Sequence, residues 1–164
     1  MNTISNLLAL ASSRPPSRTR TLVRSLVESA VEACLLPAGV SVELSILQDL
    51  AGNLDPNQAR HVLVNLLTNA SQALRGRGRI WVAAEARSGA LELRVRDDGP
   101  GIPESVRHRI FEPLFTTKAQ GSGLGLAIVR KIVDAHEGRI DMTTADGRGT
   151  KFRVTLPVEP LKKK

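Results

Sequence analysis

Residues 91–103 have the sequence Leu-Glu-Leu-Arg-Val-Arg-Asp-Asp-Gly-Pro-Gly-Ile-Pro, in which a strand pattern runs directly into a turn rich in glycine and proline. Apolar and charged residues alternate from Leu91 to Val95, as they do in a strand that buries one of its faces. Residues two positions apart share a face, so Asp97 lies on the same face as the apolar residues. The pattern therefore predicts an inward-pointing carboxylate at the end of a strand.

An inward carboxylate at this position needs a hydrogen-bond partner, because the burial of an unpaired charge is costly. Two kinds of partner are compatible with the sequence. The amino group of an adenine base can donate to the Asp97 carboxylate. Alternatively, Asp97 can cap the backbone of the turn that follows, Gly99 to Ile102. The residues alone leave both interpretations open.

The segments on either side of this strand predict further helices and strands. The predicted elements are a helix over 22–36, a strand over 40–46, a helix that Asp55 and Pro56 begin and that ends near Leu74, a hairpin of strands 80–87 and 90–97 joined at Ser88–Gly89, a short helix from Glu104, a helix over 124–136, and strands over 139–145 and 150–156. The tract 75–79, which contains two glycines, predicts a turn before the hairpin.

The helix predicted between Pro56 and Leu74 carries two asparagines that face the same way. At about 100° per residue its apolar side chains fill one continuous arc, and Asn65 and Asn69 lie side by side at the edge of that arc. Amide oxygens can ligate Mg²⁺, which in nucleotide sites also binds phosphate oxygens. A solvated helix edge explains the same pair, so both interpretations stay open at this point.

The glycine-rich tract Gly121-Ser-Gly-Leu-Gly-Leu126 precedes the helix predicted over 124–136. Its backbone N–H groups and the positive end of the helix dipole can bind a phosphate that no Cβ atom obstructs. The tract lacks the Gly-Lys-Ser/Thr of a P-loop, and no strand leads directly into it as in a dinucleotide-binding fold. An ordinary glycine-rich connection is the alternative interpretation.

Composition and charge limit the kind of protein this is. With 164 residues, 41% of them hydrophobic, the chain can bury one ordinary core, which excludes a large multidomain protein. The formal net charge of +7 favours an anionic partner: a nucleotide, a nucleic acid or an acidic protein surface. Aromatic residues make up only 2% of the chain, so we expect no nucleic-acid partner and expect the arginines of 14–20 and 75–79 to be solvated.

Cysteine, histidine and hydropathy bear on location and metal chemistry. Cys34 is the only cysteine, which excludes an internal disulfide and fits a reducing cytoplasm. The apolar stretch 7–11 is far too short to span a membrane, so we expect no membrane contact by this segment. His61, His108 and His136 lack metal-ligand spacing, and we expect all three at ordinary surface or edge positions.

Five ordered tracts together resemble the motifs of the catalytic, ATP-binding domain of sensor histidine kinases, within the GHKL (Bergerat fold) ATPase superfamily. The tracts are Asn65-Leu-Leu-Thr-Asn69-Ala70, Asp97-Asp-Gly99-Pro-Gly101-Ile102-Pro103, Phe111-Glu-Pro-Leu-Phe115-Thr-Thr-Lys118, Gly121-Ser-Gly-Leu-Gly125-Leu126 and Gly149-Thr150. The resemblance covers roughly residues 40–157. One such tract proves little, but five in this order and spacing are specific.

The resemblance implies a two-layer α/β sandwich, in which a mixed sheet packs on helices and a mobile lid covers ATP and Mg²⁺. It also implies roles for individual residues. Asn69 would be the Mg²⁺ ligand and Asn65 its neighbour at the phosphates; Asp97 would read adenine; Gly99, Gly101 and Ile102 would form the base pocket; Thr150 would contact adenine through water; Lys118, Gly121, Gly123, Leu124, Gly125 and Leu126 would surround the phosphates; Phe111 and Phe115 would anchor the lid. Asn69 and Lys118 would be the catalytic pair.

The sequence departs from this family in three respects. Leu114 stands where these kinases often have a second Phe, and Glu137 stands where a Gly often follows the histidine. No histidine of the chain lies in a phosphoacceptor box, in which His precedes an acidic residue and, a few positions on, Asn-Pro. Residues 3–16 resemble the end of the second helix of the dimerisation domain and its exit linker, as in a kinase interrupted within that domain.

The expected organisation is a helix end and linker over 1–20, the catalytic domain over 21–160 and a basic tail over 161–164. The expected function is transfer of the ATP γ-phosphoryl group to a histidine on a separate dimerisation domain, with a response regulator as an indirect partner and the cytoplasm as the location. Two alternatives stay open. One is another GHKL activity, either a serine kinase acting on an anti-sigma-factor antagonist or an ATP-hydrolysing clamp, and the other is a basic nucleic-acid-binding module.

Overall fold

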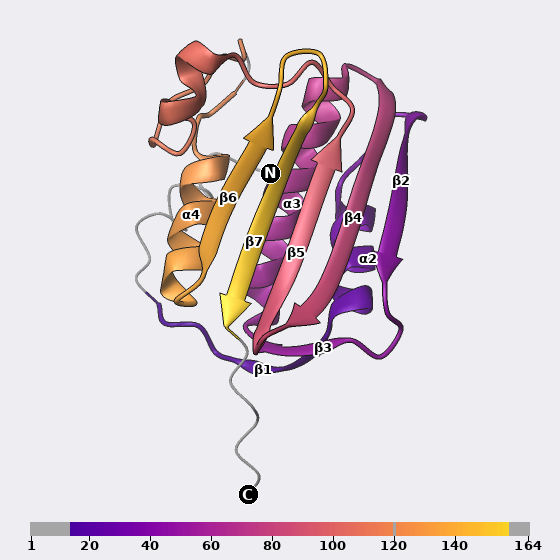
Figure 1. Ribbon diagram of the computed structural model, residues 1–164, viewed down its shortest axis with the longest axis vertical. Coiled ribbons are helices and arrows are strands. Elements are labelled where there is room, and N and C mark those ends of the chain that lie inside the picture. Colours follow the sequence, from indigo (N-terminus) through magenta and orange to yellow (C-terminus); the bar gives the residue numbers. More distant parts are fainter. Residues whose placement is uncertain (1–13, 120, 158–164) are drawn as a thin grey trace, which may run out of the picture.

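The computed structural model describes residues 14–119 and 121–157 of the chain. They fold into two layers, a five-stranded sheet and three α-helices that cover the same face of it (Figure 1). The strand order is β2-β4-β5-β7-β6, with β2 parallel to β4 and the other neighbours antiparallel. The strands are β2 (Gly39–Ile46), β4 (Arg77–Arg87), β5 (Ala90–Asp97), β6 (Arg139–Thr144) and β7 (Thr150–Pro157). The predicted two-layer α/β sandwich is confirmed.

The helical layer consists of three helices, with α3 in the middle (Figure 1). They are α2 (Val23–Ala33), α3 (Pro56–Leu74) and α4 (Gly125–Ala135), and the short 3₁₀ helix η1 (Glu104–Arg109) precedes α4. α3 packs on α2, α4 and the central strands β4 and β5, so its apolar arc is the centre of the core. None of the helices in the described part of the chain combines the length and apolar character that a membrane crossing requires.

Asp55 and Pro56 begin α3 as predicted. The Asp55 carboxylate accepts hydrogen bonds from the backbone N–H groups of Asn57 and Gln58, both at 3.0 Å. These are two of the N–H groups that a helix start leaves without partners, and Pro56 has no N–H to satisfy. At the other end, Arg75 takes a left-handed conformation with a φ of 51° and ends the helix.

The side-chain alternation predicted for β5 is also present in the structure. Leu91, Leu93 and Val95 are buried against the helices, whereas the residues between them face solvent. Asp97 lies on the inner face and is only 4% exposed. The strand therefore places a carboxylate where the apolar core meets the following loop.

A second sheet of two strands was not predicted. β1 (Thr19–Leu22) pairs antiparallel with β3 (Ala51–Leu54), and each is only four residues long, too short to show a periodic pattern. β1 spans the predicted boundary between residues 20 and 21. Leu22 precedes α2 rather than belonging to it and is 43% exposed.

His136 is buried, which makes the prediction of a surface or edge position wrong for this residue. It is 2% exposed, and both ring nitrogens are used: Nδ1 donates to the carbonyl of Ile132 at 2.9 Å, and Nε2 accepts from the backbone N–H of Asp55 at 3.3 Å. The two bonds satisfy the ring and so make its burial tolerable. His61 is half-buried, and burial lowers the pKa of its imidazole, whereas His108 is exposed.

The two residues that depart from the family pattern share one backbone feature. Leu114 and Glu137 have φ values of 66° and 58°, a region that costs a residue with a Cβ roughly 1 kcal/mol. Glycine lacks this cost, which explains why it is common in the family at the position of Glu137. β4 begins at Arg77 instead of at residue 80, so part of the tract predicted as a turn belongs to the strand. The predictions for residues 1–13 and 161–164 lie outside the described residues.

Candidate functional site

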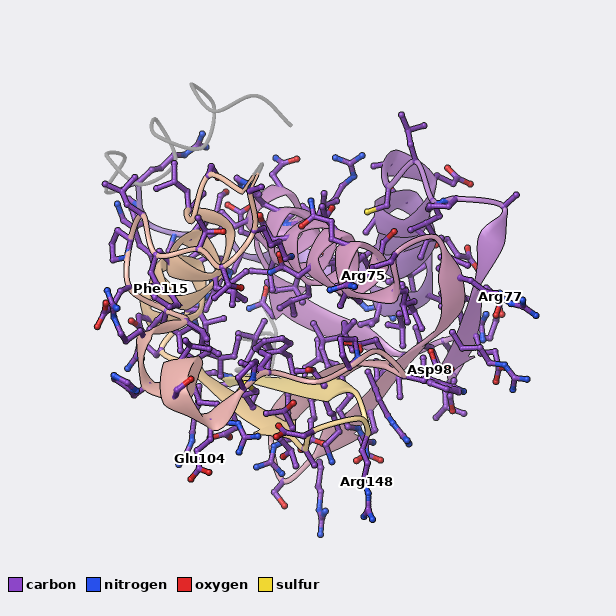
Figure 2. All side chains as sticks on the ribbon, turned by 90° about the horizontal axis from the view of Figure 1, so that it is seen from above. Arg75, Arg77, Asp98, Glu104, Phe115 and Arg148 are labelled. Atoms are coloured by element: carbon purple, nitrogen blue, oxygen red, sulfur yellow. The ribbon has the colours of Figure 1, made fainter. Side chains whose placement is uncertain are left out.

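A cleft of about 1130 Å³ lies between α3 and the segments that follow β5. Figure 2 views the molecule from the end at which Arg75 of α3, Phe115 and the β6–β7 turn with Arg148 lie around it. Most of the predicted site residues line the cleft: Asn65, Asn69, Asp97, Gly101, Ile102, Lys118, Gly121, Gly123, Gly125, Leu126 and Thr150. The two exceptions are Gly99 and Leu124, which do not contribute to its wall.

Asp97 both caps the turn and lines the cleft. Its Oδ1 accepts from the backbone N–H of Gly99 at 2.9 Å, as the structural interpretation predicted. Burial raises the pKa of the carboxyl group, while N–H groups of Gly99 and Thr150 oppose the rise, as does the charge of Lys118. The capping bond uses only part of the acceptor capacity of a carboxylate, so Asp97 can also accept from a ligand in the cleft.

Two glycines hold the backbone around Asp97 in conformations that no other residue fits. Gly149 has a φ of 79°, and a Cβ there would overlap the carbonyl oxygen of Asp97. Gly101 has a φ of 83°, and a Cβ there would overlap the carbonyl oxygen of Ala145. Both therefore bring the turn after β5 and the β6–β7 turn into direct backbone contact, which closes this end of the cleft.

Thr144 connects these turns and was not predicted. Its hydroxyl accepts from the N–H of Ile102 and donates to the carbonyl of Gly149, both at 3.0 Å. A hydroxyl has one proton, so Thr150 is the donor in the 3.2 Å contact between the two threonine hydroxyls. The acceptor sites of the Thr150 hydroxyl then remain for a ligand or a water. The feature that could have identified Thr144 from the sequence is its position opposite Thr150 when β6 and β7 are paired as a hairpin.

A row of amide side chains follows one edge of α3 toward the cleft. The Nδ2 group of Asn65 donates to the carbonyl of His61 at 2.9 Å, which leaves Oδ1 toward α4. There it meets Gly125, where a Cβ would lie only 2.9 Å from that oxygen. Asn69 and Gln72 continue the row at helical spacing. Gln72 was not predicted, although its position seven residues after Asn65 signals it.

Lys118 lies against this row. Its ammonium group is 2.6 Å from Oε1 of Gln72 and 3.4 Å from Oδ1 of Asn69. Burial lowers the pKa of Lys118, and the charge of Asp97 opposes the decrease. The arrangement shows that the amide oxygens of α3 face a cation here, and it places one positive charge between the Asn row and the loop that carries Lys118.

The glycine-rich loop leads into α4 and aims the helix start at the cleft. Leu124 is the N-cap residue, and the first turn of α4 contains no acidic residue, so its free N–H groups and the helix dipole favour an anion. The side chain of Leu124 is 1% exposed and belongs to the core. Its predicted role is thereby limited to the backbone.

The segment between η1 and α4 is fastened at its base. The ring of Phe111 packs edge-to-face on Phe152 of β7, with ring centres 6.4 Å apart. The N–H of Leu114 donates to the carbonyl of Gly123 at 2.9 Å and closes the loop between them. The Arg109 guanidinium lies 4.3 Å from the ring centre of Phe115. We call residues 112–119 and 121–123 the lid segment, and these contacts fix its two ends.

The donors in the cleft suit a magnesium ion that is held mainly by substrate. No group of three or more His, Cys, Asp or Glu side chains that could hold a metal exists among the residues that the structure describes. The available ligands are instead the amide oxygens of Asn69 and Asn65. Mg²⁺ often takes one or two protein oxygens and completes its shell with water and phosphate, so this donor set fits it.

A two-layer sandwich with a buried carboxylate, a row of amide oxygens and a helix start around one cleft is the arrangement expected of a nucleotide-binding domain. The family model described as histidine kinase-, DNA gyrase B-, and HSP90-like ATPase matches residues 54–160. The chain belongs to this family, and within it the chain is a catalytic ATP-binding domain of the sensor histidine kinase type.

Relatives and solved structures agree on this identification. Over 75% of its own length, this chain is 38% identical to the signal transduction histidine-protein kinase AtoS of Escherichia coli. Over 74% of its own length, it is 39% identical to the sensory histidine kinase/phosphatase NtrB of Rhodobacter capsulatus. It spans only 21% and 39% of those proteins. The structure matches the mycobacterial sensor histidine kinase MprB with a TM-score of 0.77 at 29% identity, over 88% of this chain and 99% of that one.

Proposed function

We propose that this domain binds Mg²⁺·ATP and transfers its γ-phosphoryl group to a histidine on a separate dimerisation domain. One observation carries the proposal: the wall of a single cleft combines the buried carboxylate of Asp97, which we assign as the base acceptor, with a set of groups suited to phosphates. That set consists of the Asn65–Asn69 edge of α3, Lys118 and the start of α4. A ligand that combines an amino-bearing base with a polyphosphate matches both Asp97 and the phosphate-binding set.

In this proposal the base and the phosphates are bound by different groups of the cleft. Asp97 accepts from the adenine amino group, and Thr150 accepts from a water that bridges to the base. Asn69, assisted by Asn65, holds a Mg²⁺ ion, which when bound neutralises phosphate charge and orients the phosphates. Lys118 leaves Gln72 for the phosphates. Catalysis then consists mainly of positioning and charge neutralisation.

The acceptor histidine comes from another polypeptide segment in this proposal. His136 uses both ring nitrogens inside the fold, and His61 lies half-buried outside the wall of the cleft. Nε2 of His61 has no hydrogen-bond partner and His108 is exposed, but neither residue lines the cleft, so none of the three histidines faces the proposed γ-phosphate position. The relationship to sensor kinases supports a histidine-containing dimerisation domain as the direct partner, a response regulator as an indirect partner and the cytoplasm as the location.

The experiment is phosphoryl transfer from γ-labelled ATP with and without a histidine-containing dimerisation domain in trans. We expect negligible label on this chain alone and label on the added domain that is acid-labile and base-stable, as phosphohistidine is. Transfer should be slow, because the two domains are not covalently linked. Strong acid-stable label on this chain alone would contradict the proposal and favour a serine kinase.

A further inference from the structure

The sheet has a second face, which no described element covers. In Figure 1 the strands lie in front and α2, α3 and α4 lie behind them. The register places Trp81 of β4 opposite Arg96 of β5, and Arg96 opposite Lys151 of β7, all with side chains on this outer face. We call these three residues the Trp81 patch. It lies across the middle strands of the sheet.

Trp81 is the only tryptophan of the chain, and no packing in the core accounts for it. Its indole N–H donates to Oε2 of Glu43 at 3.1 Å, and the guanidinium of Arg96 lies 5.1 Å from the ring centre. Both contacts hold the ring in one orientation on an outward-facing surface. Rigid Trp and Arg side chains are the types that dominate binding energy at protein interfaces.

The charges of this face leave a positive excess at the patch. The acidic residues of the face are all in ion pairs: Glu43 with Arg79, Glu85 and Glu92 with Arg94, and Asp141 with Arg139 and Arg153. Arg96 and Lys151 have no acidic partner within the described part of the chain. Two neighbouring cations without counter-charges, next to a fixed indole, are complementary to a surface with carboxylates.

Other occupants fit the patch less well. Residues 1–13 contain no acidic side chain and residues 158–164 contain one Glu against three Lys, so the rest of this chain offers no matching charge. A second copy would bring the same cations face to face. For a nucleic acid, Arg96 already occupies one side of the ring on which a base would stack, and aromatic residues make up only 2% of the chain.

We infer that the Trp81 patch is a docking surface for an acidic segment of a partner protein. Trp81 supplies the apolar contact, and Arg96 and Lys151 pair with carboxylates of the partner. The patch lies on the opposite side of the sheet from the nucleotide cleft. Docking there therefore leaves the cleft accessible, and the inference stands independently of the proposed phosphoryl transfer.

The test uses a labelled peptide of alternating glutamate and alanine as the probe and fluorescence anisotropy as the readout. We expect saturable, salt-sensitive binding that changes the emission of Trp81, and an affinity about tenfold lower in the double variant Arg96→Glu/Lys151→Glu. The matched control, Arg20→Glu/Arg60→Glu, changes the net charge equally at two exposed arginines of β1 and α3, outside the open face of the sheet, and should bind as the wild type does.

Two results would overturn the inference. Equal losses in both double variants would show that only net charge matters. Tighter binding of a DNA oligonucleotide than of the peptide, lost in the patch variant, would assign the surface to nucleic acid instead. ATP affinity, measured on the same samples, should be unchanged in both variants, and this separates a local effect from a loss of folding.

Discussion

At the scale of single residues, Asp97 is the group on which the proposed base recognition depends. It is buried at the end of an apolar strand face, yet its capping bond to Gly99 leaves acceptor capacity toward the cleft. The neighbouring turns are built to hold it there, because Gly149 and Gly101 allow backbone contacts that a Cβ would prevent. The position of the proposed base acceptor thus depends on the backbone conformation of these two glycines.

The strongest test of this backbone contact is Gly149→Ala compared with Gly147→Ala. Both glycines have positive φ, 79° and 71°, so both substitutions cost roughly 1 kcal/mol in conformational energy. Only the Cβ at 149 would overlap the Asp97 carbonyl; nothing lies within 4 Å of one at 147. We expect Gly149→Ala to lower the free energy of unfolding by more than about 2 kcal/mol in urea denaturation. Equal losses of unfolding free energy in the two variants would show that the backbone contact between Gly149 and Asp97 tolerates a Cβ.

Asn69→Asp tests the metal assignment. The substitution changes the ligand but not the base pocket, so it should reduce the affinity for Mg²⁺·ATP while affinity for metal-free adenosine stays the same. Calorimetric titration of both ligands measures the difference. Asn57→Asp, the same change at the exposed start of α3, is the control and should alter neither affinity. Equal losses for both ligands in Asn69→Asp would make Asn69 structural.

At the scale of elements, the start of α3 is joined to the segment that enters the domain. Besides capping the helix, the Asp55 carboxylate accepts from the backbone N–H of Ser17 at 2.9 Å, and the Asp55 N–H donates to His136 at the end of α4. Arg18 donates to the carbonyl of His136 at 3.2 Å. The two helices that line the cleft are thus tied to the same entering segment, the two residues before β1.

This junction predicts a pH-dependent loss of stability. Burial alone would raise the pKa of Asp55, but the N–H groups of Gln58, Ser17 and Asn57 outweigh it and lower the pKa below its usual value. The ionised carboxylate therefore stabilises the fold above the unfolded-state pKa of about 4, and this contribution disappears as the pH falls through the lower folded-state value.

Asp55→Ala should accordingly cost about 1–2 kcal/mol near pH 7 and less near pH 3. Urea denaturation at the two pH values measures the difference between wild type and variant. If the wild type and the variant differ in unfolding free energy by the same amount at both pH values, the charge of Asp55 does not contribute to stability.

The lid segment predicts a response to nucleotide. Its ends are fixed by Phe111 and by the Leu114–Gly123 bond, whereas Thr116, Thr117 and Lys118 between them are exposed. Phosphates that bind Lys118 and the loop amides should order this part. Hydrogen exchange with a non-hydrolysable ATP analogue should show slower exchange over 112–119, with β1 unchanged as the internal control. An unchanged profile in the lid would contradict this role.

Elements with long periodic patterns were predictable from sequence, and short or tertiary features were not. The arc of α3, the alternation in β5 and the cap at Asp55 are local, so the sequence predicted them together with the inward Asp97. β1 and β3 are four residues long and pair across thirty residues of chain, which no local pattern reveals. The bond of Thr144 to Ile102 and the burial of His136 against Asp55 likewise depend on partners that are distant in sequence.

At the scale of the whole molecule, the sheet separates two surfaces with different chemistry. The helix side contains the cleft, in which backbone amides, asparagines and one lysine surround the proposed phosphate end. The open side carries paired charges around the Trp81 patch. The positive charge that predicts an anionic partner is therefore found on both sides of the sheet. Lys118 is available to the proposed nucleotide on the helix side, and Arg96 and Lys151 are available to the proposed carboxylates on the open side.

The central claim is that the cleft recognises adenine through Asp97, and calorimetric titration of ATP and GTP with Mg²⁺ tests it most directly. The wild-type chain should bind ATP in preference to GTP, and Asp97→Ala should lose at least about tenfold in ATP affinity together with that preference, because the acceptor of the amino group is gone. Asp98→Ala, which removes an exposed neighbouring carboxylate, should bind ATP as the wild type does. Undiminished affinity in Asp97→Ala, with ATP still preferred over GTP, would contradict the account.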